Sequence, residues 1–174
     1  MDYNFCVPCL LGLEGPISDE LRRLDIPGVR AENGRVYFTG GGEDLARANI
    51  NLRIGERILL EVGGFTALSF DELFERTKAL PWERIIPRDG AFPVKGYSLN
   101  SKLFSVSDCQ KIIKKAIVER LKRVYGIEWF AETGALYQVQ FSIMKDHVSL
   151  CIDTSGEGLH KRGYRPAHNA APLK

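Results

Sequence analysis

The sequence predicts an α+β protein of two consecutive modules, the first with the element order βαββαβ and the second with the order ααβαββ. Three observations predict this organisation. Apolar, strand-like segments alternate with amphipathic segments at helical spacing over the 174 residues. The dipeptide Asn33-Gly34 separates two of the strand-like segments, as in a β-hairpin. Near the C-terminus, two segments alternate apolar and polar residues with a period of two, which is typical of half-buried strands.

The first module contains the predicted hairpin. Pro16 suits the first turn of a helix, and both positions of Asn33-Gly34 tolerate the positive φ of a tight turn. Leu45, Ala48 and Leu52 recur at helical spacing. The predicted elements are the strand 3–10, the helix 16–24, the strands 29–32 and 35–39, the helix 43–52 and the strand 57–63. This order is that of a ferredoxin-like unit, which we assign to residues 1–64.

The second module begins near residue 65 and is assigned to residues 65–165. Ser69 followed by Glu72 is a capping-box signature that predicts the start of a helix. Pro81-Trp82 starts a short helix that ends near Pro87. Residues 91–98 then form a strand with Pro93 near its start or at an edge.

The longest predicted helix follows this strand. Ser107 and Gln110 form a second capping box, and Gly126 suits the C-terminal stop. Its apolar side carries Ile112, Ile113, Ala116, Ile117, Leu121 and Val124. Arg120 projects into this apolar side, so it either extends to solvent or pairs with a carboxylate, for which Asp153 is one guess. The strands 137–143 and 148–153 close the module, with a turn at 144–147.

Charge is distributed unevenly along the chain. The formal net charge is +2, but residues 1–90 carry −4 and residues 91–174 carry +6. The second half is therefore the part that suits a polyanion. On the long helix, Lys111, Lys115 and Lys122 share a narrow arc flanked by Lys114 and Arg123. A solvated face is one interpretation of this arc, and a stripe that follows RNA phosphates is the other.

The segment DTSGEGLHKRGYR, residues 153–165, has three candidate interpretations. Its start imitates the Asp-Thr-Gly of aspartic proteases, but Ser155 stands at the glycine position and a second carboxylate would be required. A nucleotide loop is disfavoured because neither GxGxxG nor GxxxxGK[ST] is present and Glu157 would repel phosphate. A glycine-hinged basic loop that contacts RNA remains, beside the plainer alternative of a flexible basic tail. We expect its cations and those of the long helix to share one exposed face.

Other functional classes have little support in the sequence. Cys6 and Cys9 have the spacing of a redox or zinc pair, but no second pair completes a zinc site, so incidental thiols are favoured. No apolar run reaches the roughly 20 residues that span a bilayer. The N-terminus lacks the basic start of a signal peptide. We therefore expect a cytoplasmic protein without a metal, and we find no constellation typical of a free-standing enzyme.

Four segments resemble the THUMP region of bacterial rRNA guanine-N2 methyltransferases, a family formerly labelled as N6-adenine-specific DNA methylases. They are GVRAENGRVYFTGG, SFDELFERTKALPWERIIP, FPVKGYSLNSKLFSVSDCQKIIKKAIVERL and CIDTSGEGLHKRGYR. The resemblance covers nearly the whole chain and implies a ferredoxin-like domain followed by a THUMP domain. It implies an RNA-binding module that positions structured RNA, with large-subunit rRNA and its own methyltransferase domain as partners.

The catalytic part of that family has no counterpart in these residues. The resemblance implies that residues 166–174 are a linker toward a methyltransferase domain that binds S-adenosylmethionine, and that this chain itself holds no cofactor. The RNA-binding residues that it implies are Lys95, Lys102, Lys111, Lys114, Lys115, Lys161, Arg162 and Arg165. The alternative function is a protein-interaction domain that contacts only its own methyltransferase domain.

Overall fold

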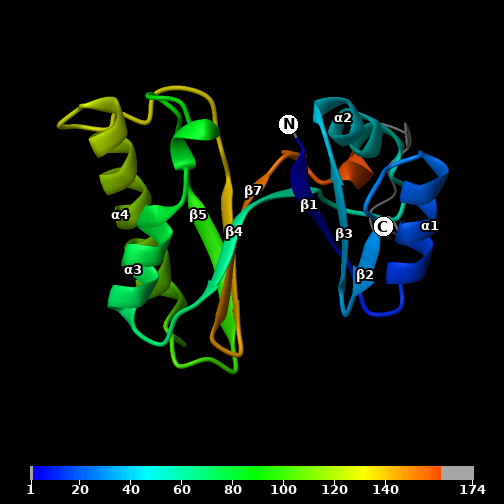
Figure 1. The fold of residues 1–174 in the computed structure, drawn as a ribbon, viewed down its shortest axis with the longest axis horizontal. Coiled ribbons are helices and arrows are strands. Elements are labelled where there is room, and N and C mark those ends of the chain that lie inside the picture. The colour runs from blue at the N-terminus through cyan, green and yellow to red at the C-terminus, as the bar shows by residue number, and fades with distance from the viewer. Residues whose placement is uncertain (1, 162–174) are drawn as a thin grey trace, which may run out of the picture. The chain divides into compact units, whose positions relative to one another are not determined.

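A computed structural model describes residues 2–161, which divide into two compact units (Figure 1). Unit 1 contains residues up to 60 and the segment from 154 onward, and unit 2 contains residues 61–153. The predicted boundaries at 64/65 and 165 differ from this division. The reason is that residues 154–161 pack on unit 1 rather than ending the second module. The predicted α+β class and the two kinds of module are confirmed.

Unit 1 is a four-stranded antiparallel sheet with two helices. Its sheet order is β2-β3-β1-β4, which is the strand order of a ferredoxin-like unit, and Phe5 of β1 is aligned with Phe38 of β3 and Leu60 of β4. Its elements are β1 (Tyr3–Pro8), α1 (Glu14–Arg23), β2 (Arg30–Glu32), β3 (Arg35–Gly40), α2 (Gly42–Asn51) and the start of β4 (Leu59–Thr66). The predicted hairpin joins β2 to β3, although only Gly34 of its two loop residues has positive φ, at 73°.

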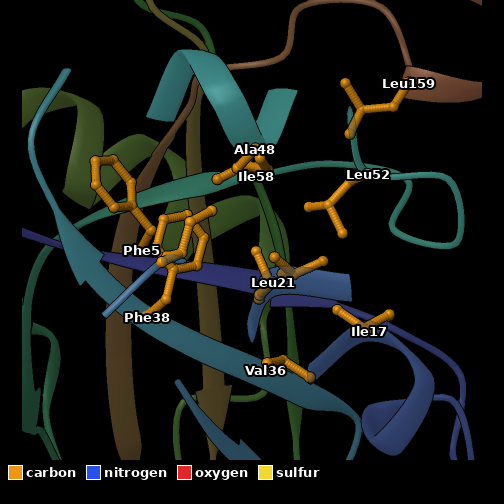
Figure 2. Close-up of a cluster of buried hydrophobic side chains, with 11 residues drawn as sticks. Phe5, Ile17, Leu21, Val36, Phe38, Ala48, Leu52, Ile58 and Leu159 are labelled. Carbon is orange, nitrogen blue, oxygen red and sulfur yellow. The ribbon is translucent and has the colours of Figure 1, made fainter. Parts of the chain in front are cut away.

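The core of unit 1 lies between the sheet and its helices (Figure 2). Alternate residues of the central strands point into it because successive side chains of a strand face opposite ways. The rings of Phe5 and Phe38 stack with centroids 4.9 Å apart. The remaining buried members are Val7, Ile17, Leu21, Ile26, Val36, Ala48, Leu52, Ile58 and Leu159. Leu159 comes from the C-terminal segment, so this core is assembled from both ends of the described chain.

The segment after β7 is fixed to unit 1 by hydrogen bonds as well as by Leu159. The amide of Thr154 donates to the Ile58 carbonyl at 3.0 Å, and the Ile58 amide donates to Ser155 Oγ at 2.9 Å. Arg57 donates to the Gly156 carbonyl, and the short helix η2 (Leu159–Lys161) follows. The residues up to 161 therefore form an ordered return to unit 1, in contrast to the flexible tail that we considered.

Unit 2 has two helices on one face of its sheet (Figure 1). Its strands have the order β4-β7-β6-β5, and β5 is parallel to β6 while β6 and β7 form an antiparallel hairpin. The two turn residues Lys145 and Asp146 both have positive φ, as a tight hairpin requires. The elements are α3 (Phe70–Ala79), the short helix η1 (Trp82–Arg84), β5 (Val94–Leu99), α4 (Val106–Tyr125), β6 (Val139–Met144) and β7 (His147–Asp153).

Helix caps in unit 2 agree with the prediction at α3 and differ at α4. Ser69 Oγ accepts from the Glu72 amide at 3.2 Å, which confirms the first cap. Helix α4 begins at Val106, so Ser107 lies in its first turn and Ser105 is the cap position. Gln110 Nε2 donates to the Val94 carbonyl at 3.0 Å, which ties α4 to β5. Gly126 ends the helix in the left-handed conformation, as predicted.

The partner of Arg120 is Glu83, not Asp153. The guanidinium makes two hydrogen bonds to the Glu83 carboxylate, Nη2 to Oε1 at 2.6 Å and Nε to Oε2 at 3.0 Å. These bonds hold the pKa of Glu83 below its ordinary value. The Asp153 carboxylate instead accepts from Gln140. The guess was wrong because η1 brings its own carboxylate to α4, a tertiary contact that helical spacing does not encode.

Candidate nucleic-acid interface

The predicted cations of unit 2 lie on β5, on the loop 100–105 and on α4. Lys95 points away from the helices on β5, and Lys102 lies in the loop. Lys111 and Lys115 lie on the exposed side of α4, opposite its buried residues Cys109, Ile113, Ala116, Ile117 and Leu121. All four of these lysines are exposed. We call Lys102, Lys111 and Lys115 the unit 2 lysine surface, because Lys95 lies on the face of the sheet opposite the helices.

The two helix lysines have few internal contacts. The Lys111 side chain is 79% exposed, and its ammonium lies 3.8 Å from Asp108 Oδ1. The Lys115 ammonium lies 5.8 Å from the centre of the Phe74 ring. An exposed ion pair of this length contributes little to stability, so these ammonium groups can meet an external anion at small cost.

Lys114 has a different environment from its neighbours. Its ammonium donates to Glu132 Oε2 at 2.5 Å and to the Phe92 carbonyl at 2.9 Å, and it lies 3.7 Å from the centre of the Phe92 ring. The same Glu132 oxygen accepts from the Phe92 amide. Glu132 has a φ of 49°, so these contacts hold an uncommon backbone conformation in the loop 127–138. Lys114 thus fastens that loop to the residues before β5.

We expect Lys114→Ala to destabilise unit 2 by about 2 kcal/mol, because the variant leaves Glu132 without its charged donor. Lys115→Ala is the matched control, one residue away and exposed, and we expect it to leave stability unchanged. Both tryptophans, Trp82 and Trp129, belong to unit 2, so tryptophan fluorescence during urea unfolding reports this unit. Equal stability of the two variants, together with a loss of RNA affinity in Lys114→Ala, would instead assign Lys114 to RNA binding, as the sequence predicted.

The remaining predicted cations belong to the C-terminal segment. Lys161 is exposed at the end of η2, and its amide donates to the Gly158 carbonyl. Arg162 and Arg165 lie outside the described residues. Lys161 is part of unit 1, whereas the lysine surface is part of unit 2. The shared face that we expected for the two groups stays a prediction.

One exposed aromatic residue beside these lysines was not predicted. Phe104 lies in the loop 100–105 between β5 and α4, and it is 82% exposed. Its neighbour Leu103 is 4% exposed. The sequence Lys102-Leu103-Phe104 contains two adjacent apolar residues, and periodicity alone does not say which of them points inward.

The described residues 2–161 show no metal site, no disulfide and no membrane-spanning helix. Within that range, no group of three His, Cys, Asp or Glu side chains could hold a metal ion. The four cysteines form no disulfide, and burial together with the nearby Glu14 raises the pKa of the Cys9 thiol. In the same range, no helix is long and apolar enough to cross a membrane.

Comparison with known proteins gives matches to both modules. A family model described as the RlmL ferredoxin-like domain matches residues 4–59, and one described as the THUMP domain matches residues 67–153. A solved structure from Listeria monocytogenes, titled as a predicted N6-adenine-specific DNA methylase, superimposes with a TM-score of 0.95 at 50% identity. That match covers 100% of this chain and 46% of the Listeria chain.

Two relatives carry RNA methyltransferase names. "Putative RNA methyltransferase YpsC" of Bacillus subtilis is 46% identical over 99% of this chain and 45% of its own length. The ribosomal RNA large subunit methyltransferase K/L of Cellvibrio japonicus is 31% identical over 100% of this chain and 23% of its own length. The chain therefore spans less than half the length of these relatives.

Proposed function

We propose an RNA-binding function for this chain, which belongs to the THUMP-domain family and carries an RlmL-type ferredoxin-like domain before its THUMP domain. In this proposal, it positions structured RNA for a methyltransferase domain that lies outside these residues. The observation that carries the proposal is the unit 2 lysine surface, formed by Lys102, Lys111 and Lys115 within the THUMP domain. Lys95, on the opposite face of the sheet, is proposed as a separate phosphate contact.

The chemistry of the lysine surface suits a phosphate backbone. Its ammonium groups are point charges on flexible stems, which bind phosphates without reading base sequence. Such contacts fit recognition of RNA by shape, with selectivity from the fold of the RNA. Lys161, at the end of the return to unit 1, and Arg162 and Arg165, which come after it in the sequence, form the second part of the proposal.

The finer proposal concerns the parent enzyme. The relatives named as RNA and large-subunit rRNA methyltransferases support methyl transfer to rRNA. We propose large-subunit rRNA as the partner, the N2 atom of a guanine as the methyl acceptor and S-adenosylmethionine as the donor bound by the parent's catalytic domain. That catalytic domain is the second proposed partner of this chain.

Salt dependence of binding tests the proposal. We expect the logarithm of the affinity for a structured rRNA fragment to fall linearly with the logarithm of salt concentration. The slope should be about −0.7 to −0.9 per neutralised phosphate, depending on strandedness. Fluorescence anisotropy of a labelled RNA measures it. An affinity that does not change with salt would contradict the proposal.

Removal of the helix charges should weaken this binding. We expect the double variant Lys111→Ala/Lys115→Ala to lower affinity about tenfold at low salt and to make the salt slope shallower, because two phosphate contacts are lost. The matched control is Arg22→Ala/Arg23→Ala on α1, which removes two charges from exposed positions of unit 1. If both variants weaken binding equally, net charge alone determines affinity and the lysine surface is not the site. If neither variant matters but the chain binds its parent's catalytic domain, the protein-interaction alternative holds.

A further inference from the structure

We propose that Asn33 is a site of spontaneous covalent modification, and that the carboxylate of Glu14 controls its rate. The modification is deamidation, in which an asparagine side chain loses ammonia and becomes a carboxylate. The residues involved form the turn between β2 and β3 and the start of α1 (Figure 1). This inference is independent of RNA binding, because it concerns only the chemistry of unit 1.

Deamidation begins with an attack by the next backbone nitrogen along the chain. In this turn the Gly34 nitrogen would form a bond to Asn33 Cγ, while the bond from Cγ to Nδ2 breaks. Nδ2 leaves as ammonia and takes up the proton that the Gly34 nitrogen loses. Water then opens the resulting cyclic succinimide at either of its carbonyls, which gives aspartate or isoaspartate. The net reaction therefore consumes water and releases ammonia, and it needs no other reactant.

The sequence and the exposure of the turn favour this reaction. A glycine after the asparagine places no side chain in the path of the attacking nitrogen. Asn33 is exposed, so water reaches its side chain and ammonia can leave. Glu32 is paired with Arg35, so Asn33 and Gly34 are the loop residues of the hairpin. The reactivity of Asn33 then depends on what holds the Gly34 amide.

Glu14 holds that amide. The Gly34 amide donates to Glu14 Oε1 at 2.7 Å, and the Gly12 amide donates to Glu14 Oε2 at 2.7 Å. Backbone hydrogen bonds, that from Gly34 most of all, hold the pKa of Glu14 below its ordinary value, so the carboxylate is ionised at neutral pH. The Cys9 amide donates to the Gly34 carbonyl at 2.9 Å. Gly34 is therefore fixed through both its amide and its carbonyl.

The hydrogen bond from Gly34 to Glu14 opposes the attack for two reasons. The Gly34 nitrogen must lose its proton before it attacks, and the electron pair left behind points where the proton was, toward Glu14 and not toward Asn33 Cγ. A negative carboxylate beside this nitrogen also disfavours the loss of the proton, because two negative charges would then be adjacent. A charge-assisted hydrogen bond must therefore break before the turn can react.

The products of the reaction would change the hairpin. Aspartate at position 33 places a second negative charge next to the amide that Glu14 binds. Isoaspartate adds a carbon atom to the backbone of a two-residue turn, and the length of such a turn fixes the register of its strands. We therefore expect a deamidated chain to have weaker pairing between β2 and β3.

Peptide mass spectrometry of the 174-residue chain after incubation in mildly alkaline buffer measures the rate at Asn33. We expect Glu14→Ala to deamidate about tenfold faster than the unsubstituted chain, because opening the turn no longer breaks a charge-assisted hydrogen bond. Glu14→Gln keeps the size of the side chain without its charge, and we expect a smaller increase. In urea, where the turn is unfolded, all three chains should react at the same rate.

Asn100 is the internal reference in the same experiment. It is exposed and is followed by Ser101, but it belongs to unit 2. Substitution of Glu14 should therefore leave the rate at Asn100 unchanged. An equal acceleration at Asn100 and Asn33 would show a general loss of structure and would contradict the proposed role of Glu14.

Leu159→Ala is the matched control for unfolding of unit 1, because it weakens the core of that unit while the Glu14 carboxylate stays in place. We expect this control to react more slowly at Asn33 than Glu14→Ala does. If it reacts as fast, unfolding of unit 1 sets the rate and the proposal is overturned. The proposal is also overturned if both Glu14 variants react at the rate of the unsubstituted chain or below it. A slower reaction would mean that the carboxylate assists the attack as a base.

Discussion

Gly96→Ala should destabilise unit 2 by about 3 kcal/mol, one of the largest effects that we expect from any single methyl group in this chain. Gly96 lies on β5 opposite Phe141 of β6. A Cβ atom at this position would lie 2.1 Å from the Phe141 carbonyl oxygen and 2.5 Å from its ring. The oxygen belongs to the strand backbone, so it cannot move aside without breaking the pairing of β5 with β6.

Tryptophan fluorescence during urea unfolding measures this effect, since both tryptophans belong to unit 2. The matched control is Gly15→Ala in α1, where a Cβ would meet nothing within 4 Å. We expect that control to be neutral or slightly stabilising because alanine favours a helix. A Gly96→Ala chain with an unchanged unfolding midpoint would show that β5 and β6 are less tightly paired than described.

Leu159→Ala should destabilise unit 1 by about 2 to 5 kcal/mol, the usual range for truncating a buried leucine. The expectation follows from the position of Leu159, which is 4% exposed within the core of unit 1 although it lies about a hundred residues away from the rest of that core. The cavity would open next to Leu52 and Ile58, two other members of the same core cluster.

Hydrogen exchange of the amides in β1 and β3 measures this loss, because these strands lie at the centre of the unit 1 sheet. Leu11→Ala is the control, since Leu11 belongs to the same unit and is 78% exposed. Equal protection of β1 in the two variants would mean that the Leu159 side chain adds nothing to the stability of unit 1.

The sequence predicted most elements because their signals are local. The Ser69 cap, the Asn33-Gly34 hairpin and the Gly126 stop each depend on residues a few positions apart, and all three elements are present. The start of α4 was misplaced by two residues, since Ser105 and Ser107 both precede acceptable first turns. Propensity alone does not choose between two such caps.

The candidate site was harder to predict because it depends on tertiary contacts. Lys111, Lys114 and Lys115 look alike in the sequence. Only the ion pair with Glu132, which lies in a later loop, shows that Lys114 holds the fold together. Phe104 would have been taken as a core residue from its apolar character. The pairing of Arg120 with Glu83 and the return of Leu159 to unit 1 are likewise contacts between residues far apart in sequence.

The return of residues 154–161 to unit 1 also determines how the molecule would carry mechanical load. Residues 2 and 161 both belong to unit 1, and the chain leaves this unit after residue 60 and re-enters it at 154. Tension applied between these two residues would therefore stretch unit 1 first. Unit 2 would bear this tension only after the hydrogen bonds between Ile58 and Thr154 had broken.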